Sequence, residues 1–207
     1  MSPDRARLFH EELTRFPADL FQFDPRIRDG WLSDRYFVRT ARTLSHSNRD
    51  PRVTLQFFAK RRGMLAGTFE CVRMLQTQLA RGYDYEDLEV ETLHDGDRIE
   101  PWEVAFRIRG RYRAFAHLET TLDGVLARRT LIATNADRAV DAAAGVPVIY
   151  FAPRHDDWRI QTPDGYAARV GGGGDVSSDA GASWWGGEGV GTMPHAMIAA
   201  FGGDVVE

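Results

Sequence analysis

The sequence predicts an α+β N-terminal domain followed by the first part of an α/β barrel, that is, a parallel β/α barrel. Strand and helix signals are mixed over the first 110 residues, a helical stretch follows, and short apolar runs then alternate with helical segments. Strands that alternate with helices at a spacing of roughly 15 to 25 residues are typical of a parallel sheet or barrel. A closed barrel requires about eight such units. Only the first few are present, so we expect a truncated barrel.

We expect three regions: a sandwich-like α+β domain over residues 1–110, a helical connection over 111–145 and an incomplete barrel over 146–207. In the first region, apolar spacing predicts a short helix at 6–16 and an apolar element at 36–38. The expected strands are 52–59, 88–93 and 104–108, and the expected helix is 63–79. The pair Asp95-Gly96 supplies a turn between the last two strands.

In the second region, we expect two helices, 112–127 and 130–144, divided near Arg128. In the third region, the apolar run ending at Arg154 predicts a strand. A second strand should follow the four glycines at 171–174, and a third strand and helix should lie within 187–201. The last four residues, 204–207, are expected to begin a fourth strand.

Composition narrows the class of protein. A 43% apolar content suffices for a real core, and a net charge of −4 argues against a general nucleic-acid binder. No segment has the length and apolar character of a membrane span, and the charged N-terminus is unlike a secretory signal. The single cysteine, Cys71, excludes an internal disulfide and a thiolate metal cluster. We therefore expect a cytoplasmic protein without membrane or nucleic-acid partners.

Arg154 is a candidate binding residue because it ends the first strand of the barrel region. The carboxyl ends of parallel strands face the site in such folds, and a guanidinium fork suits a carboxylate or a phosphate. The alternative is a surface ion pair with Asp156 or Asp157. For the glycine run, a flexible turn is favoured over a phosphate loop, because the run matches neither common phosphate-binding pattern.

His195 is the candidate catalytic residue. It lies in the segment GVGTMPHAMIAAF, where Thr192 is expected to cap a helix and Pro194 to occupy its first position. Free N–H groups and the helix dipole favour an anion at such a site and disfavour a charged imidazole. A neutral imidazole there can act as a nucleophile or as a hydrogen-bond donor. We expect no metal ligands, because His117 and Glu119 lie on different faces of a helix. The residues Ser177, Ser178 and Asp179 are better interpreted as a helix cap than as ligand contacts.

Five segments in order resemble the nicotinate phosphoribosyltransferase family: SDRYFVRT, LQFFAKRRGMLAGTFECVRML, LETTLDGVLARRTLIATNADRAV, VIYFAPR and GVGTMPHAMI. The resemblance implies a type II phosphoribosyltransferase fold, in which an α/β sandwich precedes an α/β barrel. Family members are roughly twice as long as this chain, so the resemblance also implies an N-terminal half.

Carried over by position, the resemblance implies that His195 is phosphorylated from ATP and that Arg154 contacts the nicotinate carboxylate or the phosphoribosyl group. It also implies that Tyr36 stacks on the pyridine ring in the site of a partner subunit, in a homodimer. Arg39 and Thr40 are expected neighbours of Tyr36, and Thr192 is an expected substrate contact.

The implied reaction joins nicotinate to phosphoribosyl pyrophosphate, with ATP coupling, to give nicotinate mononucleotide for NAD biosynthesis. Mg²⁺ would neutralise the pyrophosphate leaving group. Two alternatives stay open. One is a non-catalytic or split-enzyme fragment that needs a second chain, and the other is an enzyme like quinolinate phosphoribosyltransferase, which the single lysine disfavours.

Overall fold

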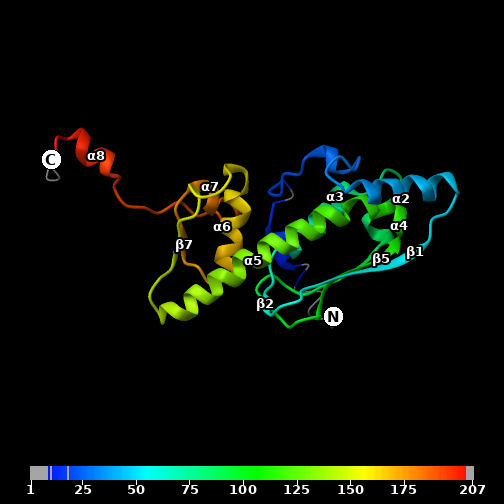
Figure 1. The fold of residues 1–207 in the computed structure, drawn as a ribbon, viewed down its shortest axis with the longest axis horizontal. Helices are drawn as coiled ribbons and strands as arrows, with labels where there is room; N and C mark the ends of the chain where they lie inside the picture. Colours follow the sequence, from blue (N-terminus) through cyan, green and yellow to red (C-terminus); the bar gives the residue numbers. More distant parts are fainter. Residues whose placement is uncertain (1–8, 10, 18, 204–207) are drawn as a thin grey trace.

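The computed structural model describes residues 9, 11–17 and 19–203 of the chain. Two parts are joined by one long helix (Figure 1). The N-terminal part contains, in order, η1 (Pro25–Ile27), α2 (Arg35–His46), β1 (Arg52–Phe58), β2 (Gly63–Met64), α3 (Thr68–Gln78), η2 (Tyr85–Asp87), β3 (Glu89–Thr92), β4 (Arg98–Ile99), β5 (Val104–Arg111), α4 (Tyr112–Phe115) and η3 (Ala116–Leu118). The long helix is α5 (Glu119–Ala143). The C-terminal part contains β6 (Ile149–Tyr150), η4 (Trp158–Ile160), α6 (Gln161–Val170), β7 (Asp175–Val176), α7 (Asp179–Ala182), η5 (Ser183–Trp185) and α8 (His195–Ala200).

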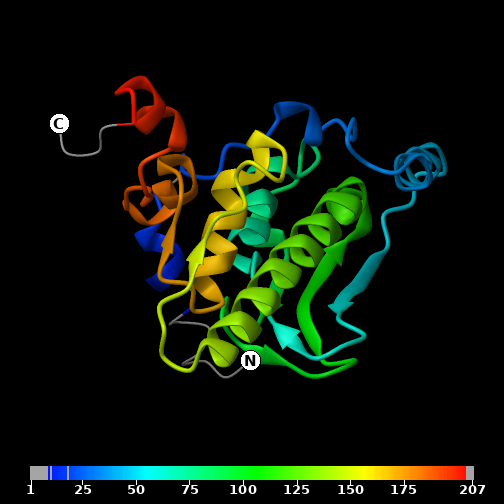
Figure 2. The same cartoon turned by 60° about the vertical axis from the view of Figure 1, so that its left-hand side comes forward.

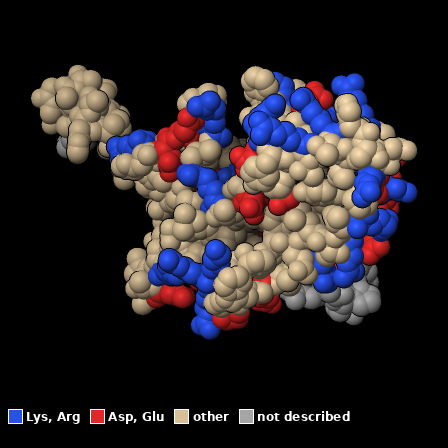
Figure 3. Space-filling view, turned by 45° about the vertical axis from the view of Figure 1, so that its right-hand side comes forward, with Lys and Arg blue, Asp and Glu red and all other residues tan. Residues whose placement is uncertain are grey.

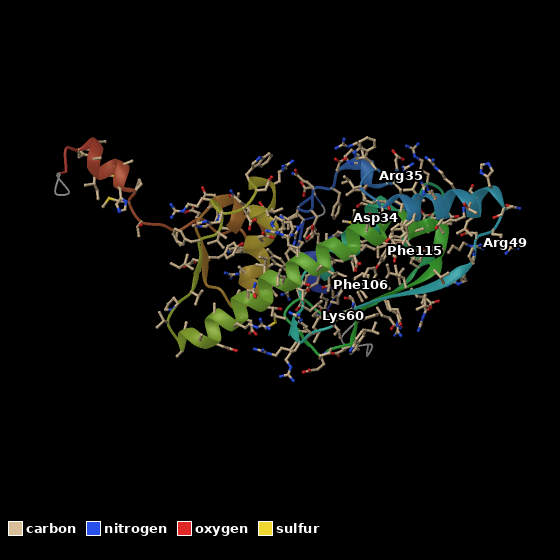
Figure 4. The ribbon with its side chains drawn as sticks, viewed as in Figure 1. Asp34, Arg35, Arg49, Lys60, Phe106 and Phe115 are labelled. Carbon is tan, nitrogen blue, oxygen red and sulfur yellow. The ribbon has the colours of Figure 1, made fainter. Side chains whose placement is uncertain are left out.

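The N-terminal part is built on a three-stranded antiparallel sheet in the order β1-β5-β3. The strand β1 alternates between exposed and enclosed residues, which leaves one face of the sheet for the core. Phe106 of β5 is fully buried on that face and meets Phe57 of β1 edge-on, with ring centroids 5.8 Å apart. Phe115 is also fully buried, and Figure 4 shows both phenylalanines between α5 and the sheet. The main core therefore lies between the sheet and the helices α3, α4 and α5.

Several expected elements of this part are confirmed, and others are wrong in detail. The three expected strands form as β1, β3 and β5. The residues at 36–38 are not a separate apolar element but lie inside α2. The expected helix at 63–79 begins only at Thr68, because Gly63 and Met64 pair with Arg98 and Ile99 as the ladder β2-β4. The segment containing Asp95-Gly96 is thus longer than a tight hairpin turn. The expected helix at 6–16 falls partly outside the described residues.

The expected division of the middle region into two helices near Arg128 is wrong. After the short α4 and η3, α5 runs unbroken for 25 residues and ends where Ala144 and Gly145 adopt positive φ angles. No proline stands near Arg128, Gly124 one turn earlier is accommodated inside the helix, and arginine is a good helix former, so the helix continues. The arginines there have tertiary partners instead.

In the C-terminal part, β6 and β7 pair in parallel, as expected for the start of a β/α barrel. The helix α6 connects them and lies beside α5 (Figures 1 and 2). Its packing is close: a Cβ atom at Gly165 would overlap the backbone of Gly181, and one at Gly171 would overlap the Ala133 carbonyl. Glycine is therefore required at both positions by the approach of another backbone.

The expected third strand does not form. Among the described residues of this segment, only Val190 extends the hydrogen bonding of β7, because its N–H donates to the Val176 carbonyl at 2.8 Å. Beyond Gly191 the chain leaves the body, and α8 stands apart from it (Figure 1). The expected fourth strand, 204–207, lies outside the described residues. None of the helices in the described part of the chain combines the length and the apolar character that crossing a lipid bilayer requires.

A network of charges, enclosed at Asp164 and Arg129 and exposed at Asp156, joins the two parts. The side chain of Asp164 on α6 is 2% exposed and accepts hydrogen bonds from two adjacent arginines of α5, from Arg128 at 2.7 Å and from Arg129 at 3.2 Å. Arg129 also donates to Glu70 of α3 at 3.0 Å, and Arg128 donates to Asp156 after β6 at 3.1 Å. Since each buried charge faces an opposite one, the network fixes three helices and one loop relative to one another.

A second polar contact lies nearby. Asp95 accepts hydrogen bonds from the backbone N–H and the hydroxyl of Thr68, at 2.8 and 2.7 Å, and from the hydroxyl of Tyr166 on α6 at 3.2 Å. Burial raises the pKa of the Asp95 carboxyl, and these hydrogen bonds offset only part of that effect. Burial and the Asp95 charge together raise the pKa of the Tyr166 hydroxyl.

The substitution Asp164→Asn should destabilise the fold by about 3–5 kcal/mol, because it leaves the buried Arg129 with one fewer anionic partner and breaks both contacts to α6. Urea denaturation measures the free energy of unfolding. The matched control is Asp137→Asn, which breaks the contact to Arg98, a side chain that is 60% exposed. That control should cost no more than about 1 kcal/mol. Equal losses for the two variants would contradict the role of the network.

Asp95 should make stability fall as the pH rises. Its folded-state pKa lies above the unfolded value, so its stabilising contribution is full below about pH 3.8 and is lost as the pH rises through the folded-state pKa. The free energy of unfolding of the wild type, minus that of Asp95→Asn, should therefore decrease between pH 3.5 and pH 7. Asp24→Asn is the control, for which the same difference in the free energy of unfolding should change with pH in the opposite direction. The reason is that the hydrogen bond from the Arg26 guanidinium lowers the pKa of Asp24 to about 2. A flat difference for Asp95→Asn would contradict the prediction.

Candidate active site at the β6–β7 edge

The carboxyl ends of β6 and β7 lie side by side because the two strands are parallel and in register, with Ile149 opposite Asp175 and Tyr150 opposite Val176. The Ser177 N–H continues the ladder by donating to the Tyr150 carbonyl at 3.1 Å. The loops that follow both strands therefore begin at one edge, which is where ligands bind in parallel α/β folds.

The loop after β6 is held at several points. The Asp157 carboxylate caps η4 by accepting from the Arg159 N–H at 2.9 Å. The Gln161 amide donates to the Pro153 carbonyl at 3.4 Å, and Asp156 is held by Arg128 from α5. These contacts bracket Arg154 on both sides, so the loop presents it from a fixed backbone.

Arg154 is exposed at this edge. The expected alternative, an ion pair with Asp156 or Asp157, is not what the structure contains: Asp156 pairs with Arg128, and Asp157 pairs with Arg159 at 2.6 Å. Arg154 has no hydrogen bond or ion pair with any residue in the described part of the chain. Its guanidinium is thus available to an anionic ligand.

Tyr150 shows that the edge is partly enclosed. Burial raises the pKa of its hydroxyl to about 12, and the negative charges of Asp164 and Asp156 add to this effect. The hydroxyl is therefore protonated over the whole physiological range. It provides a neutral hydrogen-bonding group in the neighbourhood of Asp164, Asp156 and Arg128.

Ser178, the second residue after β7, serves the local fold, as the sequence predicts. The Ser178 hydroxyl accepts from the Gly181 N–H at 3.1 Å and caps α7, and it also contacts the Gln161 side chain at 3.2 Å. The four glycines form the turn between α6 and β7, with Gly172 at a φ of 89°. In the residues that the structure describes, no group of three His, Cys, Asp or Glu side chains is close enough to hold a metal ion.

The predicted residues of α2 lie elsewhere. Tyr36 is 59% exposed and packs against Phe37, and burial together with the Asp34 charge raises the pKa of its hydroxyl. Arg39 is exposed, whereas the Thr40 hydroxyl donates to the Tyr36 carbonyl at 2.9 Å. The start of α2, marked by Asp34 and Arg35 in Figure 4, is far from β7 (Figures 1 and 4). One chain does not bring Tyr36 and Arg154 together.

His195 is the first residue of α8, but its expected environment does not form. Pro194 is the residue before the helix rather than its first residue, and Thr192 makes no capping hydrogen bond. His195 and Thr192 are both exposed. The space-filling view shows α8 as an almost uncharged group separated from the body (Figure 3). A helix of six residues on its own does not make an anion site.

The sequence prediction missed Arg128, Asp164 and Gln161. The adjacent arginines at 128 and 129 were a signal, since neighbouring helix residues lie about 100° apart and one of two adjacent charges is therefore expected near the buried side of the helix. Asp164 follows a proline and precedes a glycine, a pattern typical of a turn, so its place inside α6 was hidden.

Comparisons with known proteins agree with this architecture. Residues 34–130 match the family model described as quinolinate phosphoribosyl transferase, N-terminal domain. A solved structure of nicotinate-nucleotide pyrophosphorylase from Pyrococcus furiosus is 32% identical with a TM-score of 0.78, over 87% of this chain and 46% of that one.

Two further structures share the fold at lower identity. Human nicotinic acid phosphoribosyltransferase is 20% identical with a TM-score of 0.71, over 81% of this chain and 40% of that one. Nicotinate-nucleotide pyrophosphorylase from Ehrlichia chaffeensis is 15% identical with a TM-score of 0.55, over 100% of this chain and 68% of that one. This chain spans less than half the length of the first two structures.

The sequence match and the structural neighbours support one assignment at the level of the fold. Residues 34–130 correspond to the N-terminal domain of the quinolinate phosphoribosyl transferases, the following residues to part of the barrel, and the structural neighbours are type II phosphoribosyltransferases.

Proposed function

We propose that this protein is a type II phosphoribosyltransferase that forms nicotinate mononucleotide, and that its base is quinolinate. The observation that carries the proposal is Arg154: an exposed arginine on a fixed loop at the β6–β7 edge, within a fold shared with a nicotinate-nucleotide pyrophosphorylase. The family match of residues 34–130 favours quinolinate over nicotinate.

The proposed chemistry needs positioning and charge stabilisation more than a strong base. The ring nitrogen of the base attacks C1 of phosphoribosyl pyrophosphate, the C1–O bond breaks, and pyrophosphate leaves with the bonding electrons. With quinolinate, the 2-carboxylate then leaves as CO₂, and its electron pair on the ring carbon takes a proton. The transition state carries oxocarbenium character, so fixed donors near the departing pyrophosphate lower the barrier.

In this proposal Arg154 binds an anionic group of the substrates, and Arg128 fixes the loop through Asp156. Tyr36, with Arg39 and Thr40 beside it, would approach the β6–β7 edge of a second copy in a homodimer. Bound Mg²⁺ supplies neutralisation of the pyrophosphate charge. Because the described residues offer no metal cluster, the ion would be held mainly through phosphate oxygens of the substrate.

Nicotinate is a second candidate for the base. It is supported by the five ordered segments that resemble nicotinate phosphoribosyltransferase and by the fold shared with the human enzyme. In that case ATP is a further substrate, with His195 as the phosphate acceptor and Thr192 as its neighbour.

The test is an assay of the full-length gene product that carries this chain, with phosphoribosyl pyrophosphate, Mg²⁺ and either base, followed by chromatography of the product. We expect nicotinate mononucleotide and CO₂ from quinolinate, without ATP. Product from nicotinate alone, stimulated by ATP, would replace the proposal by the second candidate. No nucleotide from either base would refute both.

The matched variants are Arg154→Ala and Arg159→Ala, two exposed arginines of the same loop region. Arg154→Ala should lower kcat/KM about 100-fold, which corresponds to about 2.7 kcal/mol. Arg159→Ala should leave it unchanged, since that guanidinium pairs with Asp157. Equal effects of the two substitutions would show that Arg154 has no specific role.

A further inference from the structure

A pocket of about 520 Å³ opens between the end of β1 and α5. Its floor is apolar and includes Leu65, Ile99 and Leu126, which are 2%, 1% and 7% exposed. The volume lies within the range of pockets that bind small molecules, and an apolar floor with a few polar groups is their usual composition.

The pocket is distinct from the β6–β7 edge because α5 lies between the two. Arg128, Arg129 and Ala133 lie on the face of α5 that meets α6, whereas Ala127 and Thr134 line the pocket. At 100° per residue these two sets lie on opposite sides of the helix. A helix with its side chains is about 10 Å across, so one ligand cannot occupy both places.

Cationic side chains surround the opening. Lys60, Arg61, Arg62 and Arg138 line the pocket together with a single carboxylate, that of Asp123. Arg62 contacts Glu100 at 3.0 Å. Figure 4 shows Lys60 below the middle of α5, close to the end of β1.

Within the described part of the chain, three of these four cations have no anionic partner. Lys60, Arg61 and Arg138 make no hydrogen bond or ion pair with the residues for which the structure gives a placement. The pocket lining therefore carries a net positive charge in a protein whose net charge is −4.

An aromatic pair extends the apolar surface at the rim. Phe58, which lines the pocket, is 47% exposed, and its ring centroid lies 5.3 Å from that of Trp102, which is 64% exposed. The Trp102 N–H donates to the Ala59 carbonyl at 2.8 Å, and its backbone adopts a φ of 69°. A left-handed backbone conformation is unfavourable for a residue with a Cβ atom, so this exposed tryptophan is held in place at a local cost.

We propose that this pocket binds a small organic anion with an aromatic body, such as an aromatic carboxylate. The apolar floor and the Phe58–Trp102 pair accept the ring, and the unpaired cations bind the acidic group. Charge complementarity identifies the ligand class: a neutral aromatic molecule would leave the cations unused, and an inorganic anion would leave the floor unfilled.

Isothermal titration of the protein with 1-naphthoate tests the proposal, with 1-naphthamide as the neutral analogue. We expect one naphthoate per chain and binding of the amide that is weaker by about tenfold or more. Equal binding of the two compounds would refute the role of the cations. The absence of naphthoate binding would refute the site.

Variants locate the ligand. Ala127→Trp should fill the pocket and abolish binding, and Arg138→Ala should weaken it, while Asp123→Asn should strengthen it by removing the one carboxylate. Arg109→Ala is the matched control, because this exposed arginine lies on the sheet, 3.6 Å from Glu89 and Glu91. It should bind like the wild type, and circular dichroism should show all variants folded.

Two results would overturn the proposal. If Arg154→Ala weakens naphthoate binding as much as Arg138→Ala does, the anion occupies the β6–β7 edge. If sedimentation shows a dimer that Ala127→Trp disrupts and naphthoate does not affect, the pocket is an interface between copies of the chain.

Discussion

The buried contact of Asp164 with Arg128 and Arg129 is the constraint on which the rest of the molecule depends. It is a polar junction between the N-terminal sheet domain and the C-terminal part, and it lies beside aromatic contacts of Phe16 with Tyr166 and of Phe21 with Trp184, whose ring centroids are 5.9 and 4.7 Å apart. Buried ion pairs contribute little net stability compared with apolar packing, but they demand one geometry. Here Arg128 contacts both Asp164 and Asp156, so the same arginine also holds the loop that contains Arg154.

The fold was largely predictable in the segments that have a periodic apolar pattern. Alternation in β1 and β5 and the short apolar run before Arg154 gave the strands, because these patterns reflect burial on one face or on both. The continuity of α5 through Arg128 was not predictable, since it follows from partners on α3 and α6 that are distant in sequence. The third expected strand failed for a related reason: only Val190 finds a hydrogen-bond acceptor on β7.

The candidate site was predictable only in part. The position of Arg154 at a strand end was predictable from the sequence. That its guanidinium is unpaired was not predictable, because it depends on the ion pairs of Asp156 with Arg128 and of Asp157 with Arg159. Tyr36 was identified by resemblance, and His195 from its expected helix start as well as by resemblance; one chain places α2 and α8 away from the β6–β7 edge. The region was expected as two helices, whereas α5 is one continuous helix that joins α6 through one face and lines a basic pocket with the other.

We propose that the charge network positions Arg154 for an anionic substrate. A double-mutant cycle of Asp156→Ala and Arg154→Ala, with the affinity of the full-length gene product for phosphoribosyl pyrophosphate as the readout, tests it most directly. Asp156→Ala should weaken binding even though it removes a negative charge, and it should have no further effect once Arg154 is absent. Tighter binding in Asp156→Ala, or effects that add within about 0.5 kcal/mol, would contradict the account.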